Sequence, residues 1–326
     1  MLSVERVTRS IAGQPVDRVA SGEFLIDRDF AEALLRPVAG RAPARRYTAG
    51  AAPEAQLEVC AALGADLICV HHPPPGAGRS RATSAAAIRR AVEAGLFVFS
   101  VRDGPFQRVQ REAGLEGALA AVIRDSGGVA AQLRRNAREL AGSMGRDVEA
   151  GAHGMIVADD IAFQRGLYFS PNFLESGLAP VWGGLAAAGH RLGVPVFLHS
   201  DGNLLSALPA IAAAGFDGLQ GLEAGAGMGI AAVRQKAGQG LCLMGGLDAA
   251  LLGPGPAPPQ AAGPAGSGAG ADGEQALASA VRELVGHAAP GGRYLFGSSS
   301  GLFAGLDPAK VRLAYRLAAA AGGPAA

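Results

Sequence analysis

The sequence predicts an α/β fold, a single (β/α)8 TIM barrel, on three observations. Short β-branched and aromatic runs alternate with longer stretches of Ala, Leu and Arg that have helical periodicity. This alternation implies parallel strands joined by helical crossovers. Eight such strands in 326 residues fit a closed barrel, which takes about 250 residues, better than an open sheet. A doubly wound sheet is the alternative, but the glycine fingerprint expected after its first strand is absent from residues 22–27.

The predicted strands and helices follow one another regularly along the chain. The strands are Gly22–Ile26, Leu67–His71, Phe97–Val101, Met155–Asp159, Val194–His199, Gly218–Leu222, Leu241–Gly245 and Arg293–Gly297. Helices between and after them include Ser84–Ala94, Val129–Ala150, Pro171–Leu192, Glu274–Ala288 and Pro308–Ala319. Two of these begin with proline, which the first turn of a helix tolerates.

One segment interrupts this rhythm. Gly253–Gly273 is Gly, Pro and Ala apart from Gln260, Ser267 and Asp272. Such a composition cannot bury enough apolar surface to offset its ordering entropy, so we expect a disordered insertion between the seventh strand and its helix. A mobile lid is the alternative. The tail Gly322–Ala326 is expected to fray for the same reason, and the whole chain, 1–326, is expected to form one domain.

The composition excludes several classes of protein. The formal net charge is +1, so nothing indicates nucleic acid or an anionic membrane as a partner. No apolar run approaches the ~20 residues that a spanning helix needs, and Met1–Arg18 lacks a secretory apolar stretch. The cysteines, Cys60, Cys69 and Cys242, are odd in number and lie in apolar segments, which is typical of a reducing compartment. We therefore expect a cytoplasmic protein that binds a small-molecule substrate, with no nucleic-acid or membrane partner.

Polar side chains follow nearly every predicted strand at its carboxyl end, where barrels of this kind hold their active sites. In chain order they are Glu23, Asp27, His71, His72, Arg102, Asp103, Asp159, Asp160, His199, Asp201, Glu223, Asp248 and the Gly297–Gly301 turn. Solvated loop residues would be the simpler explanation. Their convergence on one end of the barrel nevertheless predicts an enzyme.

The sharpest local feature is His199–Asn203. Side chains alternate across a strand, so His199 and Asp201 point the same way. If that way is inward, they can ligate a metal or act as a base and its orienting group. Alternatively, Asp201 or Asn203 caps a turn and His199 lies in the core. The remaining histidines, His153, His190 and His287, precede strands and are expected to be structural.

Three further motifs are weaker. Asp159 and Asp160 face opposite sides of an extended chain, so one can point at a ligand while the other pairs with Arg165 or caps a turn. Cys69 and His71 face together, although a buried strand cysteine usually only packs. Gly245–Gly246 and the serine-rich turn expose backbone amides that can bind an anion.

Five segments, in the right order along nearly the whole chain, resemble the uroporphyrinogen decarboxylase superfamily. They are Pro15–Arg18, Met155–Pro171, His199–Asn203, Ala214–Gln220 and Pro290–Ser299. The resemblance implies a (β/α)8 barrel and one of two chemistries. These are decarboxylation of the acetate arms of uroporphyrinogen, in porphyrin biosynthesis, and methyl transfer involving corrinoid proteins.

Departures from the superfamily patterns bear on this choice. The decarboxylases carry an Arg-Gln-Ala-Gly-Arg stretch near the first strand, whose guanidinium groups suit a tetrapyrrole with many carboxylates. Here the matching Ser21–Asp27 is acidic, and a late histidine of the decarboxylases falls at Ser300. The cobamide-linked thiol methyltransferases bind zinc through His-x-Cys and a late cysteine. Only His199 carries over, with Asp201 at the second position and Ser299 or Ser300 at the third; aspartate can bind zinc, but serine is a poor ligand.

The resemblance therefore favours methyl transfer between a small methylated compound or cofactor and a corrinoid protein. It implies catalytic roles for His199, Asp201, Asp160 and Glu223, and a Zn²⁺ site on His199, Asp201 and Glu223. Substrate-binding roles fall to Glu23, His71, Asp159, Arg165, Ser299 and Ser300. A homodimer is compatible with the sequence. The alternatives are a uroporphyrinogen decarboxylase and a non-catalytic binding barrel. The binding barrel is kept because relatives often have Asn where this chain has Gly246, and a Pro-Pro pair where it has Ala224–Gly225.

Overall fold

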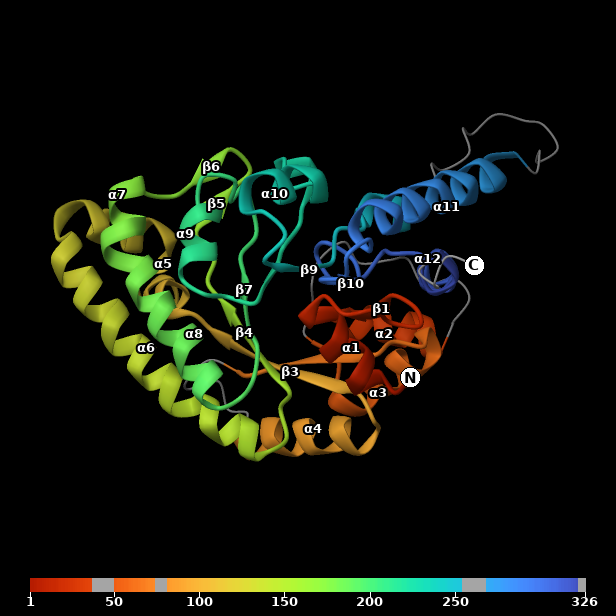
Figure 1. Cartoon of the computed structure of the whole chain (residues 1–326), viewed down its shortest axis with the longest axis horizontal. Helices are drawn as coiled ribbons and strands as arrows, with labels where there is room; N and C mark the ends of the chain where they lie inside the picture. Colours follow the sequence, from red (N-terminus) through yellow and green to blue (C-terminus); the bar gives the residue numbers. More distant parts are fainter. Residues whose placement is uncertain (37–49, 74–80, 254–267, 322–326) are drawn as a thin grey trace.

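A computed structural model describes residues 1–36, 50–73, 81–253 and 268–321, and it contains a closed barrel of eight parallel strands (Figure 1). Around the ring the order is β1-β10-β9-β8-β7-β4-β3-β2. The strands are β1 (Ala20–Glu23), β2 (Leu67–His71), β3 (Phe97–Asp103), β4 (Gly154–Ala158), β7 (Val196–His199), β8 (Gly218–Gln220), β9 (Cys242–Met244) and β10 (Tyr294–Phe296). Each overlaps a predicted strand, so the predicted (β/α)8 barrel is confirmed and the doubly wound sheet is excluded.

The first and last strands close the ring. Ala20 pairs with Leu295 and Ser21 with Phe296 in parallel register. On its other side β1 pairs with β2, with Gly22 opposite Leu67. No edge strand remains in the barrel, because every strand has two neighbours.

The barrel interior is filled by side chains. Large residues from facing strands meet inside it, and the rings of Phe99 and Phe197 lie 4.9 Å apart between centroids. Space for these rings comes from inward glycines: a Cβ on Gly154 would lie 2.6 Å from the Phe99 ring. Helix α1 (Ser3–Ala12) closes the amino end of the barrel, where Val7 is fully buried in the interior cluster. In the described residues the barrel interior is therefore covered at its amino end, and its carboxyl end is the usual place for an active site.

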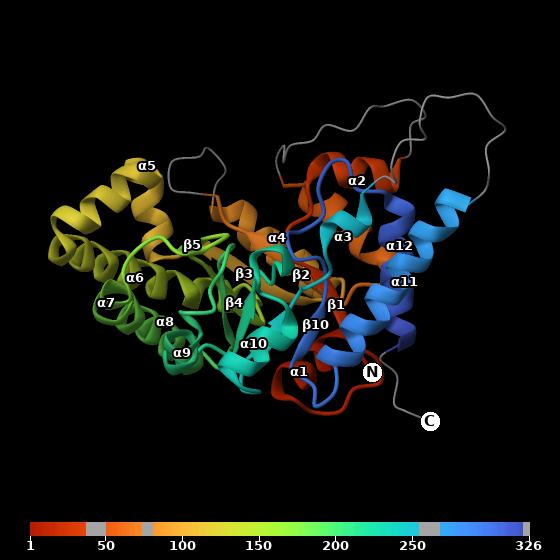
Figure 2. The same ribbon diagram turned by 90° about the horizontal axis from the view of Figure 1, so that it is seen from above.

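Helices surround the barrel (Figures 1 and 2). They are α2 (Arg28–Leu35), α3 (Pro53–Leu63), α4 (Arg81–Glu93), α5 (Pro105–Arg124), α6 (Ser126–Glu149), α8 (Ala179–Arg191), α9 (Leu208–Ala213), α10 (Ile230–Ala237), α11 (Gly268–Ala288) and α12 (Pro308–Ala321). In both views the long helices α5 and α6 lie at one end of the molecule, and α11 and α12 lie toward the other. None of the helices in the described part is long and apolar enough to cross a bilayer.

Several sequence expectations need correction at this level. The predicted helix Pro171–Leu192 is three pieces: a short α7 (Pro171–Phe173), a π-helical turn η1 (Leu174–Leu178) and α8. A two-stranded hairpin of β5 (Ala162–Phe163) and β6 (Gly166–Leu167) was not predicted. The insertion predicted at Gly253–Gly273 lies largely outside the described residues, in 254–267. Its last six residues, however, belong to α11, so the expectation of disorder up to Gly273 is wrong. The tail 322–326 also lies outside the described residues.

Candidate active site

The candidate site forms where three neighbouring strands end. In the barrel β4 pairs with β7 and β7 with β8, which places Ala158 opposite His199 and His199 opposite Gln220. The loops after these strands carry Asp160, Asp201 and Glu223. The ring closure thus gathers residues that are up to 63 positions apart in sequence numbering, from 160 to 223.

Asp160, His199 and Asp201 form a tight polar cluster. The Nε2 atom of His199 lies 3.7 Å from Oδ1 of Asp160 and 4.0 Å from Oδ1 of Asp201. The backbone N–H of Asp201 donates to Oδ1 of Asp160 over 3.1 Å, which fixes the two loops against each other. One ligand atom from each residue lies within 4.8 Å of the other two. Among the described residues this is the group with the spacing of a metal site, so the structure pairs Asp160, rather than Glu223, with the two sequence-predicted ligands.

The buried amide of Gln220 orients His199. Its Nε2 donates to the backbone carbonyl of Ser299 over 3.3 Å, so its Oε1 faces Nδ1 of His199, with which it makes a short hydrogen bond. An amide oxygen only accepts, so Nδ1 of His199 must carry the proton. In the neutral ring the Nε2 lone pair therefore points toward Asp160 and Asp201, as a metal ligand or a base requires.

Phe24 and His71 form the wall beside His199. The Phe24 ring stacks on the His199 ring with centroids 4.0 Å apart, and its edge meets the His71 ring at 4.8 Å. Nε2 of His71 bonds to the carbonyl of Phe24 over 2.6 Å. Burial lowers the pKa of His71 to about 4, so its ring is neutral near pH 7. His71 thus lies next to the cluster as a neutral polar group, where the sequence had placed a substrate-binding residue.

Glu223 and the serine turn lie on the other side of the cluster. Glu223 accepts a hydrogen bond from the Gly202 N–H and another from the Ser300 hydroxyl, each over 3.4 Å. Burial raises the pKa of Asp201, and the charges of Asp160 and Glu223 raise it further, while His199 lowers it. Two carboxylates thus face one imidazole, with Glu223 near enough to act on Asp201, and this arrangement favours a cation or a proton between them.

Asp159 does not belong to this cluster. It is fully buried, its Oδ1 accepts the backbone N–H of Gln107 over 2.7 Å, and its Oδ2 accepts the indole N–H of Trp182 over 2.9 Å. Burial raises its pKa to about 7. It therefore ties α5 and α8 to the barrel, on the side away from the mouth. A direct substrate contact, as predicted from the sequence, has no room there.

Glu23 is likewise turned away from the mouth. Its carboxyl group accepts from the Ser298 hydroxyl at 2.6 Å, from the Ser298 N–H at 3.0 Å and from the Tyr315 hydroxyl on α12 at 2.8 Å. It is 4% exposed, and burial raises its pKa to about 7. Glu23 therefore has an indirect role in place of the expected substrate contact, because it holds the serine turn. From this turn the Ser299 carbonyl accepts a hydrogen bond from Gln220, and the Ser300 hydroxyl donates one to Glu223.

Other strand-end residues have local structural roles. Asp27 caps α2 and Asp248 caps the 3-10 turn η3 (Ala249–Leu252). His72 turns outward to the Ser100 hydroxyl, and Arg102 pairs with Asp147 over 2.6 Å. Arg165 is exposed in the β5–β6 hairpin, and the hydrogen bonds of Asp159 and Asp160 described above go to other groups.

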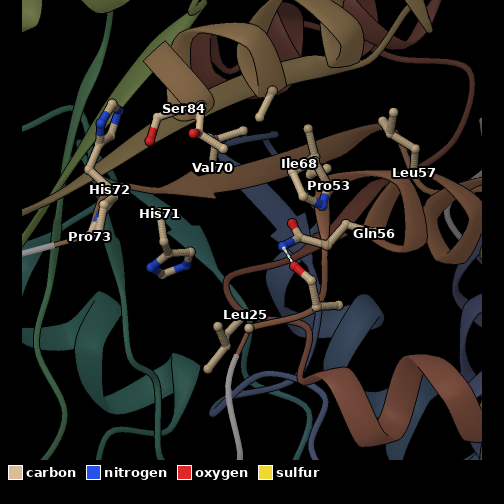
Figure 3. A pocket seen from close by; sticks show the side chains of 14 residues that line it. Leu25, Pro53, Gln56, Leu57, Ile68, Val70, His71, His72, Pro73 and Ser84 are labelled. Atoms are coloured by element: carbon tan, nitrogen blue, oxygen red, sulfur yellow. Dashed lines mark hydrogen bonds between the residues drawn. The ribbon is translucent and has the colours of Figure 1, made fainter. Parts of the chain in front are cut away.

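A cavity of about 240 Å³ reaches His71, but Asp160, His199 and Asp201 do not line it (Figure 3). It lies between β2 and helices α3 and α4, and its walls are mainly apolar, with Leu25, Leu57 and Val70 among them. Figure 3 shows the rings of His71 and His72 pointing to different sides of β2. A cavity of about 150 Å³ can hold benzene, so this one is large enough for a small organic group.

Two functional residues were missed by the sequence reasoning. Gln220 lacks a charge and resembles any polar residue at a strand end, although its place in the segment Ala214–Gln220 was a usable signal. Phe24 lies within the predicted first strand, Gly22–Ile26, and was given no role of its own.

Comparisons with known proteins agree with the barrel. The family model described as uroporphyrinogen decarboxylase (URO-D) matches residues 80–320. Among solved structures, a methyltransferase from Methanosarcina mazei aligns with a TM-score of 0.71 and 16% identity over 98% of each chain. A chitinase from Chromobacterium violaceum aligns with a TM-score of 0.48 and 13% identity, over 83% of this chain and 96% of that one. At these identities the first likeness shows the fold, and the second is too distant to support an argument. No curated protein matches the sequence.

Proposed function

Because the chain belongs to the uroporphyrinogen decarboxylase family, we propose that it is an enzyme that transfers a methyl group between a small methylated compound or cofactor and a corrinoid protein. The observation that carries this proposal is the cluster of Asp160, His199 and Asp201 at the barrel mouth. The likeness in fold to a methyltransferase is consistent with it.

The donor set fits Zn²⁺. One imidazole nitrogen and two carboxylate oxygens are ligands that zinc accepts, and three protein ligands leave a fourth position open, as in catalytic zinc sites. The hydrogen bond from Nδ1 of His199 to Gln220 is the outer contact that metal-binding histidines generally make. When bound, zinc would supply a Lewis acid that activates a thiol, hydroxyl or water at neutral pH. Glu223, which the sequence suggested as a ligand, lies outside this donor set.

The proposal gives the chain's own residues distinct tasks. During methyl transfer the bond between the methyl carbon and its heteroatom breaks, and the heteroatom keeps that electron pair. The methyl carbon forms its new bond to the cob(I) cobalt of the corrinoid substrate, which supplies the electron pair of that bond. Glu223, positioned by Gly202 and Ser300, would donate a proton to that leaving atom. The methylated compound would bind over the cluster at the barrel mouth, with the corrinoid protein covering it.

The first test is metal analysis of the purified protein. We expect about one zinc per chain in the wild type, and loss of zinc and of activity in His199→Ala and Asp201→Asn. His199 serves the site rather than the core, so His199→Ala should change the free energy of unfolding by no more than ~1–2 kcal/mol. Asp248→Asn is the matched control, since it alters a strand-end aspartate that only caps a turn. Full zinc content in His199→Ala would refute the metal site.

The second test is methylation of cob(I)alamin, followed by its absorbance, with methanol, methylamine, dimethyl sulfide and anisole as donors. Turnover that depends on His199 supports the proposal. Decarboxylation of uroporphyrinogen without methyl transfer would make the chain a decarboxylase. Inactivity with both substrate classes, in protein without metal, would identify a binding barrel.

A further inference from the structure

Two arginines meet at the amino end of the barrel, away from the candidate active site. Arg234 lies in the last turn of α10, and Arg293 directly precedes β10. The Arg234 guanidinium donates to the carbonyls of Leu241, at 2.5 Å, and Arg293, at 2.8 Å. Arg293 donates to the carbonyls of Ile11 and Gly240, each at 3.1 Å. The two side chains thus join the loop between α10 and β9, the residue before β10 and helix α1. Figure 2 shows α1 and α10 near each other.

Both guanidinium groups have N–H donors that make no hydrogen bond within the described part of the protein. A guanidinium has five N–H bonds, and the hydrogen bonds above occupy two on each arginine. Nε of Arg234 and both Nε and Nη2 of Arg293 make none of these hydrogen bonds, and none of the three is among the buried, unpartnered side-chain atoms of the described residues, so their N–H groups reach solvent. Neither arginine forms an ion pair with a described carboxylate. Burial lowers the pKa of Arg234, Cys242 acts to raise it, and the charge of Arg293 lowers it.

A cavity of about 450 Å³ opens beside them. Arg234, Arg293, His287 and Gln239 provide its polar walls, and Ile230, Ala231 and Pro290 its apolar ones. No acidic side chain lines it. The cavity therefore offers fixed positive charge and hydrogen-bond donors, next to a small apolar surface.

The backbone around Arg293 is strained in the way that functional sites often are. Arg293 has φ = 58°, and among the described residues it is the one non-glycine with positive φ. It follows Gly291 and Gly292, whose φ values are 81° and 73°. The side chain lies against Gly13, where an added Cβ would come within 3.2 Å of its Nε. The left-handed turn and this glycine together hold the Arg293 guanidinium beside Arg234.

We infer that this cavity binds the phosphate group of a small phosphorylated molecule. A pair of guanidinium groups with free N–H donors matches the geometry and charge of phosphate oxygens. The cavity is several times larger than a phosphate, so the rest of the molecule would lie on Ile230, Ala231 and Pro290. The site is at the opposite end of the barrel from Asp160, His199 and Asp201, so the inference does not depend on the proposed methyl transfer.

Isothermal titration of the wild-type protein with inorganic phosphate and with glycerol 3-phosphate, each up to about 10 mM, tests the inference. We expect both to bind, more weakly as sodium chloride is added, because salt screens charge. Tighter binding of glycerol 3-phosphate would identify an organic phosphate as the ligand, and equal binding would identify phosphate itself. The absence of binding by either probe overturns the inference.

The decisive variant leaves both arginines in place. Ala231 is exposed, lines the cavity and lies three residues before Arg234, on the same face of α10. Ala231→Glu would place a carboxylate against the guanidinium pair and should weaken phosphate binding about tenfold or more. Ala231→Gln has a similar size without charge and should bind within about threefold of the wild type. Equal binding by both variants, or equal loss in both, contradicts a phosphate site at these arginines. Arg282→Gln, on the exposed face of α11, controls for a general loss of positive charge.

Discussion

At the scale of single residues, the site depends on groups that hold other groups. His199 is oriented by Gln220, Gln220 by the carbonyl of Ser299, and the turn containing Ser299 by Glu23. Only His199 belongs to the proposed metal site. Gln220, Ser299 and Glu23 determine which nitrogen of His199 carries the proton and how its ring is oriented. Their contribution can be measured separately.

Gln220→Ala tests the orientation of the imidazole. If His199 binds zinc, loss of this hydrogen-bond partner should weaken zinc affinity by about 10- to 100-fold, which is typical for outer contacts of metal ligands. Competition with a chromophoric chelator measures the change. Gln132→Ala on α6 serves as the control, and circular dichroism checks that the fold is retained. Unchanged affinity in Gln220→Ala would remove Gln220 from the site.

Glu23→Gln tests the buried carboxyl. Burial raises the pKa of Glu23 from 4.5 to about 7, so between these pH values the unfolded chain loses the proton more readily than the folded protein. The free energy of unfolding therefore falls as pH rises through this window and levels off above it. Glu23→Gln lacks this effect, so the stability of the variant relative to the wild type should rise by about 2–3 kcal/mol between pH 4.5 and pH 8.

Urea unfolding at several pH values measures this difference. The titrations of His71 and Asp159 occur in both proteins and cancel in the comparison. Glu175→Gln, at an exposed position, should show no such trend. A difference between Glu23→Gln and the wild type that is constant with pH would mean that Glu23 titrates normally.

Single residues also show where sequence reasoning reached its limit. The sequence singled out all three residues of the cluster, because each lies at or just after the end of a strand that is easy to recognise. They are Asp160, His199 and Asp201. The directions of Glu23 and Asp159 were not predictable, because barrel strands are apolar on both faces and lack the alternation that would show which side faces inward. In β4 the side chain of Ile156 faces the barrel interior. Because side chains alternate along the chain, Asp160 points to the same side as Ile156, and Asp159 points to the outside of the barrel. The neighbouring strands, rather than the local sequence, determine this choice.

At the scale of elements, the strands were the easiest to predict and the short pieces the hardest. The buried strands are rich in β-branched and aromatic residues between glycine-rich turns, and all eight were found. The β5–β6 hairpin has two residues in each strand, too few to show any periodicity. The start of α11 lies in a run of Gly and Ala that composition alone assigned to disorder. Helix and strand ends depend on such local contacts as well as on composition.

One helix start offers a clean measurement. Asp125 is exposed, and its side chain accepts the Gly128 N–H over 2.8 Å at the beginning of α6. Asp125→Ala should therefore lower the free energy of unfolding by about 1 kcal/mol, the usual contribution of an N-cap. Asp125→Asn should retain most of the stability, since asparagine caps equally well. Urea unfolding distinguishes them, and equal stability of all three proteins would mean that the cap contributes nothing.

At the scale of the whole molecule, helix α1 closes the amino end of the barrel. Val7 is fully buried among the interior side chains, whereas the next residue, Thr8, is exposed. Val7→Ala should lower the free energy of unfolding by about 2–3 kcal/mol, through lost apolar burial and the cavity that remains. Thr8→Ala should change it by less than about 0.5 kcal/mol. A similar small effect of both substitutions would show that α1 covers the barrel loosely.

The pairing of β1 with β10 also constrains how the protein is made. Glu23 and the Ser298 that it binds are 275 positions apart. A ribosome therefore releases the first strand long before its last partner exists, and a nascent chain that stops short of β10 presents two unpaired strand edges. Such edges are places where chains associate wrongly. Ring closure must follow the emergence of β10 from the ribosome, and until then the growing chain is in the form most likely to need a chaperone.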